Sequence, residues 1–567
     1  MMASLTHTFS KALLTLLVGQ SAALSFFPGI KANNLQLASV LGIDGHTARF
    51  NPEKIAETAI ASGSGSEVPT HWATIPIDHE DDDVGTYQNR YWLSTDFYKP
   101  GGPVFVLDGG EGNAFNLAQT FLGGPDNFFA HYLKEFNGLG LVWEHRYYGE
   151  SLPFPVNLST PNEHFQYLTN TQSLADIPYF AEEFKLNGTD MSPESTPWIM
   201  LGGSYPGMRA AFTRNDYPDT IFASFAMSAP VEARVNMTIY FEQVYRGMVA
   251  NGLGGCVQDI QVINNYIDSQ LDKKGQAADD IKELFLGKEG THNTNGDFAA
   301  AIGSIYNLFQ SYGVDGGEEG LSKLCSYLDE SASPDGIAPK IGAQALTEKF
   351  AAWPPLLSII NDLGSQLNDG ECNCKGQNNS TRTTCELGGR FNAPDTISWT
   401  WQYCTEWGFL QGDNEGQHSM LSKYQSLAYQ QEICYRQFPG ARESGLIPDH
   451  PEARETNDET GGWFMRPSNV FWSAGEFDPW RTLTPLSNET FAPEDVYITT
   501  NVPRCGVETP ENVLFGYVIP MAEHCFDYRL SYKPADKSRQ LFSLALKKWL
   551  PCWRAEHDPR GVQRKWM

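Results

Sequence analysis

Basic residues are scarce in this chain. Its 567 residues hold 40 Lys and Arg against 68 Asp and Glu, which gives a formal net charge of −28. Binding to nucleic acid or to anionic lipid needs a basic face, so this balance argues against a nucleic-acid partner. Internal repeats and long low-complexity tracts are also absent from the sequence. Apolar residues make up 41% of it, which is enough for a large core and excludes wholesale disorder.

Long hydrophobic runs are missing as well. Beyond the N-terminal segment no stretch approaches the roughly 18 apolar residues of a membrane helix, so we expect no membrane span. Lys11 precedes the short apolar run 12–18 and the small residues that end at Ala23. This pattern predicts a secretory signal peptide over residues 1–23, because the run is too short to cross about 30 Å of hydrocarbon. We therefore expect a secreted, extracellular protein, with the lysosome or vacuole as the alternative.

Cysteine is absent from the first 255 residues and frequent afterwards. The ten cysteines are Cys256, Cys325, Cys372, Cys374, Cys385, Cys404, Cys434, Cys505, Cys525 and Cys552. An even number in a secreted chain predicts a disulfide framework, although the sequence leaves its connectivity open. Cys372, Cys374 and Cys385 also allow a metal cluster, but they lack paired C-x-x-C motifs. We expect disulfides there, and neither a metal nor another cofactor.

Six N-x-S/T sequons predict glycosylated asparagines at the surface, in keeping with secretion. They are Asn157, Asn187, Asn236, Asn378, Asn379 and Asn488.

The apolar pattern predicts an α/β protein interrupted by a helical insertion. Residues 72–232 alternate short, continuous apolar runs with helix-length segments, which is typical of parallel strands covered on both faces. Helical patterns dominate residues 236–440, and strand character returns at 470–474 and 513–519. We expect five parts: the signal peptide 1–23, an N-terminal arm or propeptide 24–68, a first core part 69–235, a disulfide-rich helical insertion 236–460 and a second core part 461–567.

The strongest local motif is Gly202-Gly203-Ser204-Tyr205-Pro206-Gly207. It follows the apolar run 198–201 and precedes a helical stretch, and this order is typical of the nucleophile elbow of the α/β-hydrolase fold. Small neighbours are needed because the serine occupies a strained turn. Pro206 stands where the usual motif has its second glycine. We predict an α/β-hydrolase fold with a large helical cap insertion, and Ser204 as its nucleophile.

A triad of this fold runs in the order Ser, Asp, His along the chain. Asp478 follows a strand-like run, with Glu476 as its local competitor. His524 is the only histidine between His450 and His557, which leaves one candidate for the base. We therefore predict Asp478 as the triad acid and His524 as the general base.

The oxyanion of such an enzyme needs two N–H donors. One is predicted to be the amide of Tyr205, because it follows the nucleophile. For the second we select Gly110, in the glycine-rich loop after the strand-like run 104–107. The neighbouring Glu111 is a weaker candidate for holding a substrate amine.

Four further segments complete a resemblance to a known family. They are Glu144-His145-Arg146-Tyr147-Tyr148-Gly149-Glu150-Ser151, Trp401-Gln402-Tyr403-Cys404-Thr405-Glu406, Gly475 with Asp478-Pro479-Trp480, and Ala522 with His524-Cys525 and Asp527. Together with the elbow they resemble the lysosomal prolyl carboxypeptidase and dipeptidyl peptidase II family of serine peptidases. The resemblance runs from about residue 70 to 550 and is weakest in the insertion. Pro206 and Ala474 depart from the family pattern.

The resemblance implies a secreted or lysosomal serine peptidase that cuts peptide or protein substrates after proline, mostly in acid. Met208 and Trp480 would line the proline pocket, whereas Glu144 to Ser151 is expected to form a structural hydrogen-bond knot. Carboxypeptidase, dipeptidyl peptidase and endopeptidase action stay open, as does a homodimer. Two alternatives remain: a secreted esterase or lipase of the same fold, and a catalytically inactive hydrolase-fold binding protein.

Overall fold

A computed structural model describes residues 31–51, 53–63, 67–365, 367, 372–376 and 384–557. The predicted signal peptide and the sequons at Asn378 and Asn379 lie outside the described residues. The sequons at Asn157, Asn187, Asn236 and Asn488 fall on exposed positions, as a glycan requires. Their glycosylation stays a prediction.

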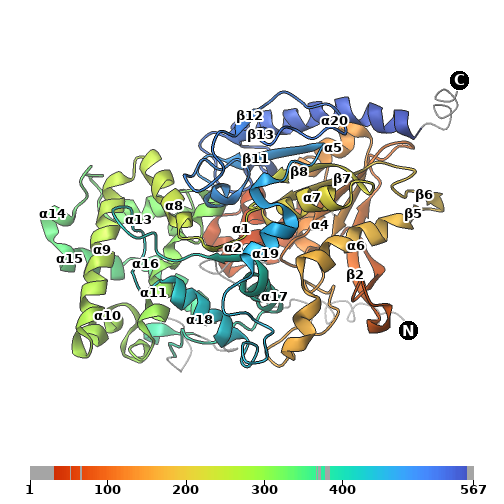
Figure 1. Ribbon diagram of the computed structural model, residues 1–567. Coiled ribbons are helices and arrows are strands. Elements are labelled where there is room, and N and C mark those ends of the chain that lie inside the picture. Colours follow the sequence, from red (N-terminus) through yellow and green to blue (C-terminus); the bar gives the residue numbers. More distant parts are fainter. Residues whose placement is uncertain are drawn as a thin grey trace, which may run out of the picture.

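A nine-stranded sheet forms the centre of the core (Figure 1), in the order β1-β2-β4-β3-β7-β8-β11-β13-β12. The pairs β1–β2 and β2–β4 are antiparallel, and the other pairs are parallel. The strands are β1 Thr70–Pro76, β2 Thr86–Ser94, β3 Val104–Asp108, β4 Leu139–Trp143, β7 Trp198–Gly203, β8 Ile221–Met227, β11 Val470–Gly475, β12 Tyr497–Thr499 and β13 Val513–Ile519. This topology confirms the predicted α/β class.

Helices cover both faces of the sheet because alternate residues of each strand point to opposite sides. Phe105 and Leu107 of β3 belong to a cluster with α4, α5 and α20, whereas Val104 and Val106 belong to one with α6 and α7. The strands β3, β4 and β7 are therefore buried along their whole length. The core helices are α4 Phe115–Leu122, α5 Phe128–Phe136, α6 Asn170–Glu182, α7 Tyr205–Asp216 and α20 Asp536–Glu556. A small hairpin pairs β5 Lys185–Leu186 with β6 Thr189–Asp190.

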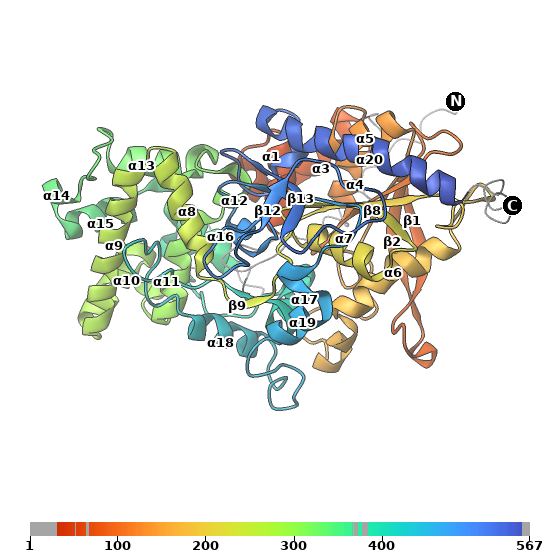
Figure 2. The same ribbon diagram turned by 45° about the horizontal axis from the view of Figure 1, so that its top comes forward.

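Between β8 and β11 the chain leaves the sheet and forms a helical cap, which lies to one side of the core in Figures 1 and 2. Its only described strands are the short parallel pair β9 Arg234–Asn236 and β10 Gly408–Leu410. The cap helices are α8 Ile239–Ala250, α9 Gly254–Lys273, α10 Gln276–Leu286, α11 Asn295–Gly303, α12 Phe309–Tyr312, α13 Leu321–Leu328, α14 Ala338–Ile341, α15 Ala343–Ala351, α16 Pro354–Ser365, α17 Pro394–Gln402, α18 Leu427–Gln437 and α19 Ala453–Thr460.

The N-terminal arm is folded over its described residues. It forms α1 Lys31–Val40, α2 Gly45–Phe50 and α3 Glu53–Ser62. Leu35, Leu37 and Ala38 of α1 are buried in the same cluster as α4 and α20. Figures 1 and 2 both place α1 between the cap and the sheet. The arm is therefore packed as part of the molecule.

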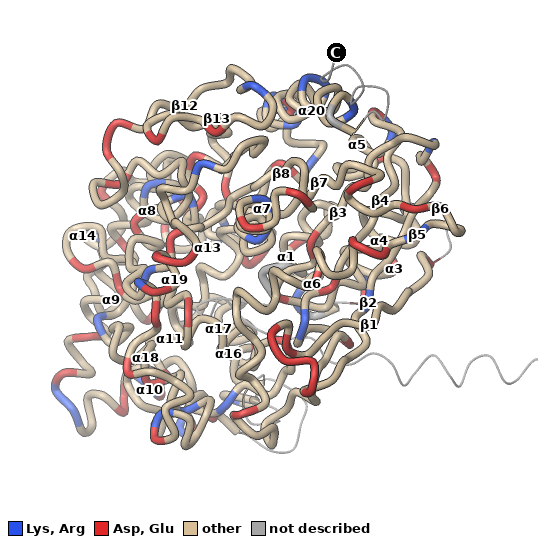
Figure 3. Tube along the Cα trace, turned by 45° about the vertical axis from the view of Figure 1, so that its right-hand side comes forward, with Lys and Arg blue, Asp and Glu red and all other residues tan. Residues whose placement is uncertain are grey.

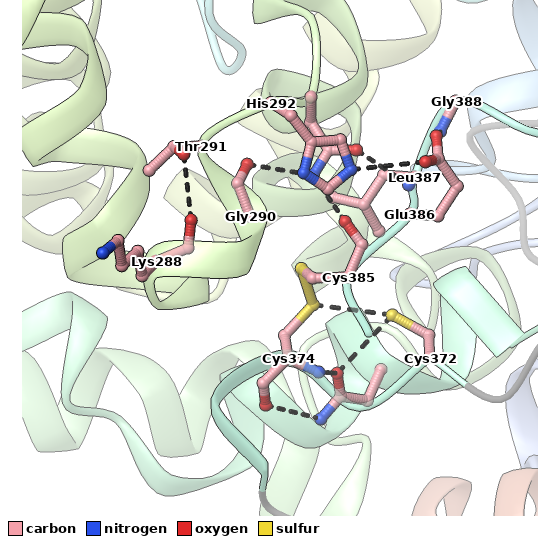
Figure 4. Close-up of a disulfide and its surroundings, with 12 residues drawn as sticks. Lys288, Gly290, Thr291, His292, Cys372, Cys374, Cys385, Glu386, Leu387 and Gly388 are labelled. Carbon is pink, nitrogen blue, oxygen red and sulfur yellow. Dashed lines mark hydrogen bonds and ion pairs between the residues drawn. A yellow bond between two sulfur atoms is a disulfide. The ribbon is translucent and has the colours of Figure 1, made fainter. Parts of the chain in front are cut away.

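Four disulfides agree with the predicted framework, and three of them lie in the cap: Cys256–Cys325, Cys374–Cys385, Cys404–Cys434 and Cys505–Cys552. Cys372 and Cys525 are free and buried. Figure 4 shows Cys372 beside one bridge, with its Sγ 3.5 Å from Cys374 Sγ. The three sulfurs lie within 4.8 Å of one another. Two of them share the disulfide bond, so they are not thiolates that a metal could use.

Asp and Glu residues are spread along the chain in the core and the cap alike (Figure 3). In the described part of the chain, no helix combines the length and the apolar character that crossing a bilayer requires.

Candidate active site

Ser204 lies on the sharp turn between β7 and α7. Its backbone has a positive φ of 71°, a strained conformation for a residue that is not glycine. The turn is held from both sides: Ser204 N–H donates to Met227 O at 2.9 Å, and Gly207 N–H donates to Ser204 O at 2.8 Å. Ser204 is thus fixed at the carboxyl end of a central strand, where ligands of open α/β sheets bind.

The glycines around this turn are required by close contacts. A Cβ on Gly202 would lie 2.1 Å from Pro206 O, and a Cβ on Gly110 would lie 2.3 Å from Pro206 Cγ. Gly110 also has a positive φ of 61°. Pro206, the departure from the usual elbow motif, is therefore accommodated by the absence of a side chain at Gly110.

Asp478 and His524 come together although 46 residues separate them. His524 Nδ1 lies 2.9 Å from Asp478 Oδ1, and both side chains are buried. Asp478 Oδ1 also accepts the Trp480 N–H at 2.9 Å, which fixes the carboxylate. The His524 main-chain N–H donates to Gln310 O of the cap at 3.0 Å. The imidazole is thus oriented by the core and the cap together.

The electrostatics of His524 are set by two opposing effects. Burial disfavours the charged imidazolium and would lower its pKa, but the neighbouring Asp478 carboxylate favours it. Burial is the largest single effect, but Asp478 and the neighbouring Cys525 together outweigh it, so the pKa of His524 lies well above its ordinary value. This environment stabilises the imidazolium that forms when a base takes a serine proton.

A small cavity brings Ser204 and His524 to one space. The other lining residues come from the β3–α4 region, the elbow, the cap, the segment after β13 and the arm: Asp108, Gly109, Glu111, Gly112, Asn113, Asn116, Leu117, Phe121, Gly203, Pro206, Gln310, Cys525, Tyr528, Asn34, Gln36, Leu37 and Val40. Among the described residues His524 Nε2 has no hydrogen-bond partner. No bond joins it to Ser204 Oγ here, and such contacts often tighten only when substrate binds.

The two predicted oxyanion donors differ in their present partners. The Tyr205 N–H is the first amide of α7 and donates to no other described group. The Gly110 N–H, in contrast, donates to Asp108 Oδ1 at 2.8 Å. Asp108 is itself held by Arg209, whose Nε lies 3.1 Å from Asp108 Oδ2. The Gly110 amide is therefore engaged by a buried ion pair in this structure, and its role as the second oxyanion donor stays a prediction.

The three predicted substrate-binding residues lie in different surroundings. Glu111 lines the cavity and is buried. Trp480 packs beside the base, with ring centroids 6.4 Å apart, and its Nε1 donates to Gln310 Oε1 at 3.0 Å. Met208 is fully buried, in the same cluster as Trp480. Neither Met208 nor Trp480 belongs to the wall of the cavity that Ser204 and His524 line.

The segment Glu144 to Ser151 forms a buried knot, as expected. Glu144 Oε1 lies 2.6 Å from Arg90 Nη2, and its Oε2 accepts the Ser151 hydroxyl at 2.7 Å. Asp395 of α17 extends the knot to the cap by accepting the Gly149 N–H at 2.9 Å. Burial is the main reason that the pKa of Asp395 is raised to about 6.

Sequence reasoning missed two contributors to the site. Gln310 could not be identified from the sequence, because it belongs to no motif and a glutamine on a short helix is common. Asn34 and Gln36 lie in a segment expected to be an arm or propeptide. Its apolar residues Leu35, Leu37 and Ile55 were the available hint, since a detached arm has no need to bury them.

Comparisons with known proteins found a matching family model and several relatives. The family model for "Serine carboxypeptidase S28" matches residues 76–502. A probable extracellular serine carboxypeptidase of Arthroderma benhamiae is 28% identical over 446 residues, covering 73% of this chain and 59% of its own. The thymus-specific serine protease of Mus musculus is 26% identical over 511 residues, which cover 87% of this chain and 89% of that protein. The lysosomal Pro-X carboxypeptidase of Pongo abelii is 37% identical over 150 residues, which cover 26% of this chain and 29% of that protein.

Proposed function

Since the chain belongs to the serine carboxypeptidase S28 family and is a serine-type peptidase, we propose that Ser204, His524 and Asp478 are its catalytic triad. The observation that supports this proposal is the 2.9 Å contact between His524 Nδ1 and Asp478 Oδ1, both of which are buried. His524 lines the same cavity as Ser204. The carboxylate holds the imidazole in one tautomer and leaves Nε2 as the base.

The reaction follows from these positions. Ser204 Oγ attacks the scissile carbonyl carbon while the proton of the Ser204 hydroxyl passes to His524 Nε2. The Tyr205 N–H donates to the oxyanion that forms, and the macrodipole of α7 favours the same negative charge. His524 then protonates the leaving amine as the C–N bond breaks. Water repeats the sequence on the acyl-enzyme and restores Ser204.

We propose that the bond cut follows proline, and that the protein acts outside the cell. Trp480 offers a flat apolar surface next to the base, and proline can pack on such a surface at low cost in conformational entropy. Support for the location comes from the family, which includes a relative named as extracellular and one named as lysosomal. An esterase of the same fold is the outcome that would replace this proposal.

One experiment tests the whole scheme. The secreted enzyme is treated with a fluorophosphonate probe and assayed on matched peptides that differ only before the bond, with Ser204→Ala and the exposed Ser195→Ala in parallel. We expect probe labelling at Ser204, and a loss of more than about 10⁴-fold in turnover for Ser204→Ala alone. Equal rates for proline, leucine and lysine would reject proline specificity. Hydrolysis of esters but of no peptide would establish the esterase instead.

A further inference from the structure

The N-terminal arm is anchored to both halves of the molecule. On the cap side, Tyr312 OH donates to Ile43 O at 2.8 Å. On the core side, Arg529 Nη2 donates to Ser39 Oγ at 2.8 Å. After α3, the Val68 N–H donates to Gln119 Oε1 of α4, also at 2.8 Å. Hydrogen bonds to the cap and to the core thus hold the arm at several points along its described residues.

A buried ion pair adds to this attachment. Glu319 of the cap lies 2.8 Å from His46 Nδ1 and 3.5 Å from Arg49 Nε, and the side chains of Glu319 and Arg49 are each 1% exposed. Removing the arm would leave the Glu319 carboxylate in the cap without the Arg49 guanidinium and the His46 ring, which is strongly unfavourable for a buried charge. It would also uncover the apolar cluster that holds Leu35, Leu37 and Ala38. The folded enzyme therefore depends on the arm.

One face of α1 lies at the catalytic cavity. Asn34, Leu37 and Val40 follow one another at i, i+3 and i+6, and Gln36 lies beside them on the same wall. They complete a cavity that Ser204 and His524 also line. A substrate that reaches Ser204 through this cavity meets amide and aliphatic side chains from the arm.

Gln36 brings a polar group with an unpartnered oxygen to this wall. Its side chain is 7% exposed, and its Nε2 donates to Cys525 O, directly after the predicted base, at 3.4 Å. With the amide oriented in this way, Oε1 has no hydrogen-bond partner among the described residues. A buried acceptor without a donor is costly, and a main-chain N–H of a bound peptide would satisfy it once the Gln36 side chain turns toward the cavity, because Oε1 is covered in this structure.

We propose that the arm is retained in the active enzyme, and that Gln36 Oε1 accepts a main-chain N–H of the bound peptide substrate. This inference rests on the proposed peptidase function and adds a specificity element to it. The Gln36 hydrogen bond adds binding energy for an extended peptide and none for a small ester that has no N–H to donate. Gln36 is a substrate-binding residue and takes no part in bond breaking.

The test compares Gln36→Ala and the nearly isosteric Gln36→Leu with Glu57→Ala, an exposed substitution in the same arm. We expect both Gln36 variants to lose about 3- to 10-fold in kcat/KM on peptides, the range for one hydrogen bond, and to keep ester hydrolysis and fluorophosphonate labelling. A set of peptides N-methylated at one amide at a time should contain one member that the wild type cuts about 3- to 10-fold more slowly than its parent. The Gln36 variants should cut that member and its parent equally.

Two outcomes overturn the inference. One is equal peptide kinetics in the wild type and both Gln36 variants, with no N-methyl position that couples to Gln36. The other is a probe-labelled, active enzyme whose intact mass shows that it begins after residue 36, a measurement that needs no variant. A wild type that is labelled by the probe but cuts no peptide contradicts the proposed function instead, and its intact mass still decides whether the arm is retained.

Discussion

The main-chain N–H of His524 donates to the carbonyl oxygen of Gln310 at 3.0 Å, which joins the predicted base to the helical cap. The Gln310 side chain extends the link, because its Oε1 accepts from Trp480 Nε1 and from Tyr240 OH, each at 3.0 Å. The cap therefore helps to hold the histidine and the tryptophan beside it, in addition to covering them.

Gln310→Leu should show how much this link contributes. The main-chain hydrogen bond to His524 stays, but Trp480 and Tyr240 lose their shared acceptor. We expect this loss to lower the free energy of unfolding by about 1–3 kcal/mol. We also expect kcat/KM to fall by about 10-fold because Trp480 loses its orientation. Urea denaturation and peptide kinetics measure both, with the exposed Gln344→Ala as the control. Unchanged kinetics together with lost stability would show that Gln310 is structural only.

Gly110→Ala tests the contact with Pro206. The new Cβ would lie 2.3 Å from Pro206 Cγ, and the residue has a positive φ. Gly101→Ala is the matched control, since Gly101 also has a positive φ but nothing within 4 Å of a Cβ. We expect the Gly101→Ala control to be destabilised by about 1–2 kcal/mol, because alanine is strained at a positive φ. Gly110→Ala should be destabilised more, because the steric contact with Pro206 is added, and it should also lose activity. Adding Pro206→Ala should recover part of that loss; no recovery would contradict the steric explanation.

The pH profile should carry the signature of the His524–Asp478 pair. The raised pKa of His524 means that the base is charged, and inactive, up to a higher pH than a free histidine. We therefore expect the acidic limb of kcat/KM to lie above about pH 6.5 for the free enzyme. In Asp478→Asn the limb of the probe-labelling rate should move to lower pH, whereas the exposed Asp449→Asn should leave it in place. A wild-type limb below pH 6 would mean that burial outweighs the Asp478 charge.

Glu406 should make the protein more stable in acid. Burial is the main reason that its pKa is raised to about 8, while the Asn170 N–H, which donates to its carboxyl group, opposes the shift. The folded state then holds a proton that the unfolded state releases, so stability falls as pH rises from about 4.5 to about 8. Glu406→Gln should shrink the loss between pH 5 and pH 8 by about 2–5 kcal/mol, measured by urea denaturation, and the exposed Glu415→Gln should not. An unchanged pH dependence in Glu406→Gln would contradict the raised pKa.

Local motifs made much of the site predictable. The strand, turn and helix around Ser204 are specified by neighbouring residues, because glycine is needed wherever the backbone approaches another chain segment closely. The α/β class followed from continuous apolar runs such as Leu139–Trp143, which only a strand buried on both faces needs. Asp478 and His524 could be predicted for a related reason: each lies in the loop that follows a strand, β11 or β13, and parallel strands end at one edge of the sheet.

Tertiary structure alone decided the partners of these residues. Gln310 reaches His524 across 214 positions of sequence, and the Gly110 amide is taken by Asp108 because Arg209 fixes that carboxylate. The balance between burial and the Asp478 charge at His524 likewise depends on packing that no local pattern records. The arm shows the same limit: sequence identifies a separate N-terminal segment, but only the folded chain places Gln36 at the catalytic cavity. Residue type and local spacing determined the kind of chemistry, and long-range packing determined which groups remain free to perform it.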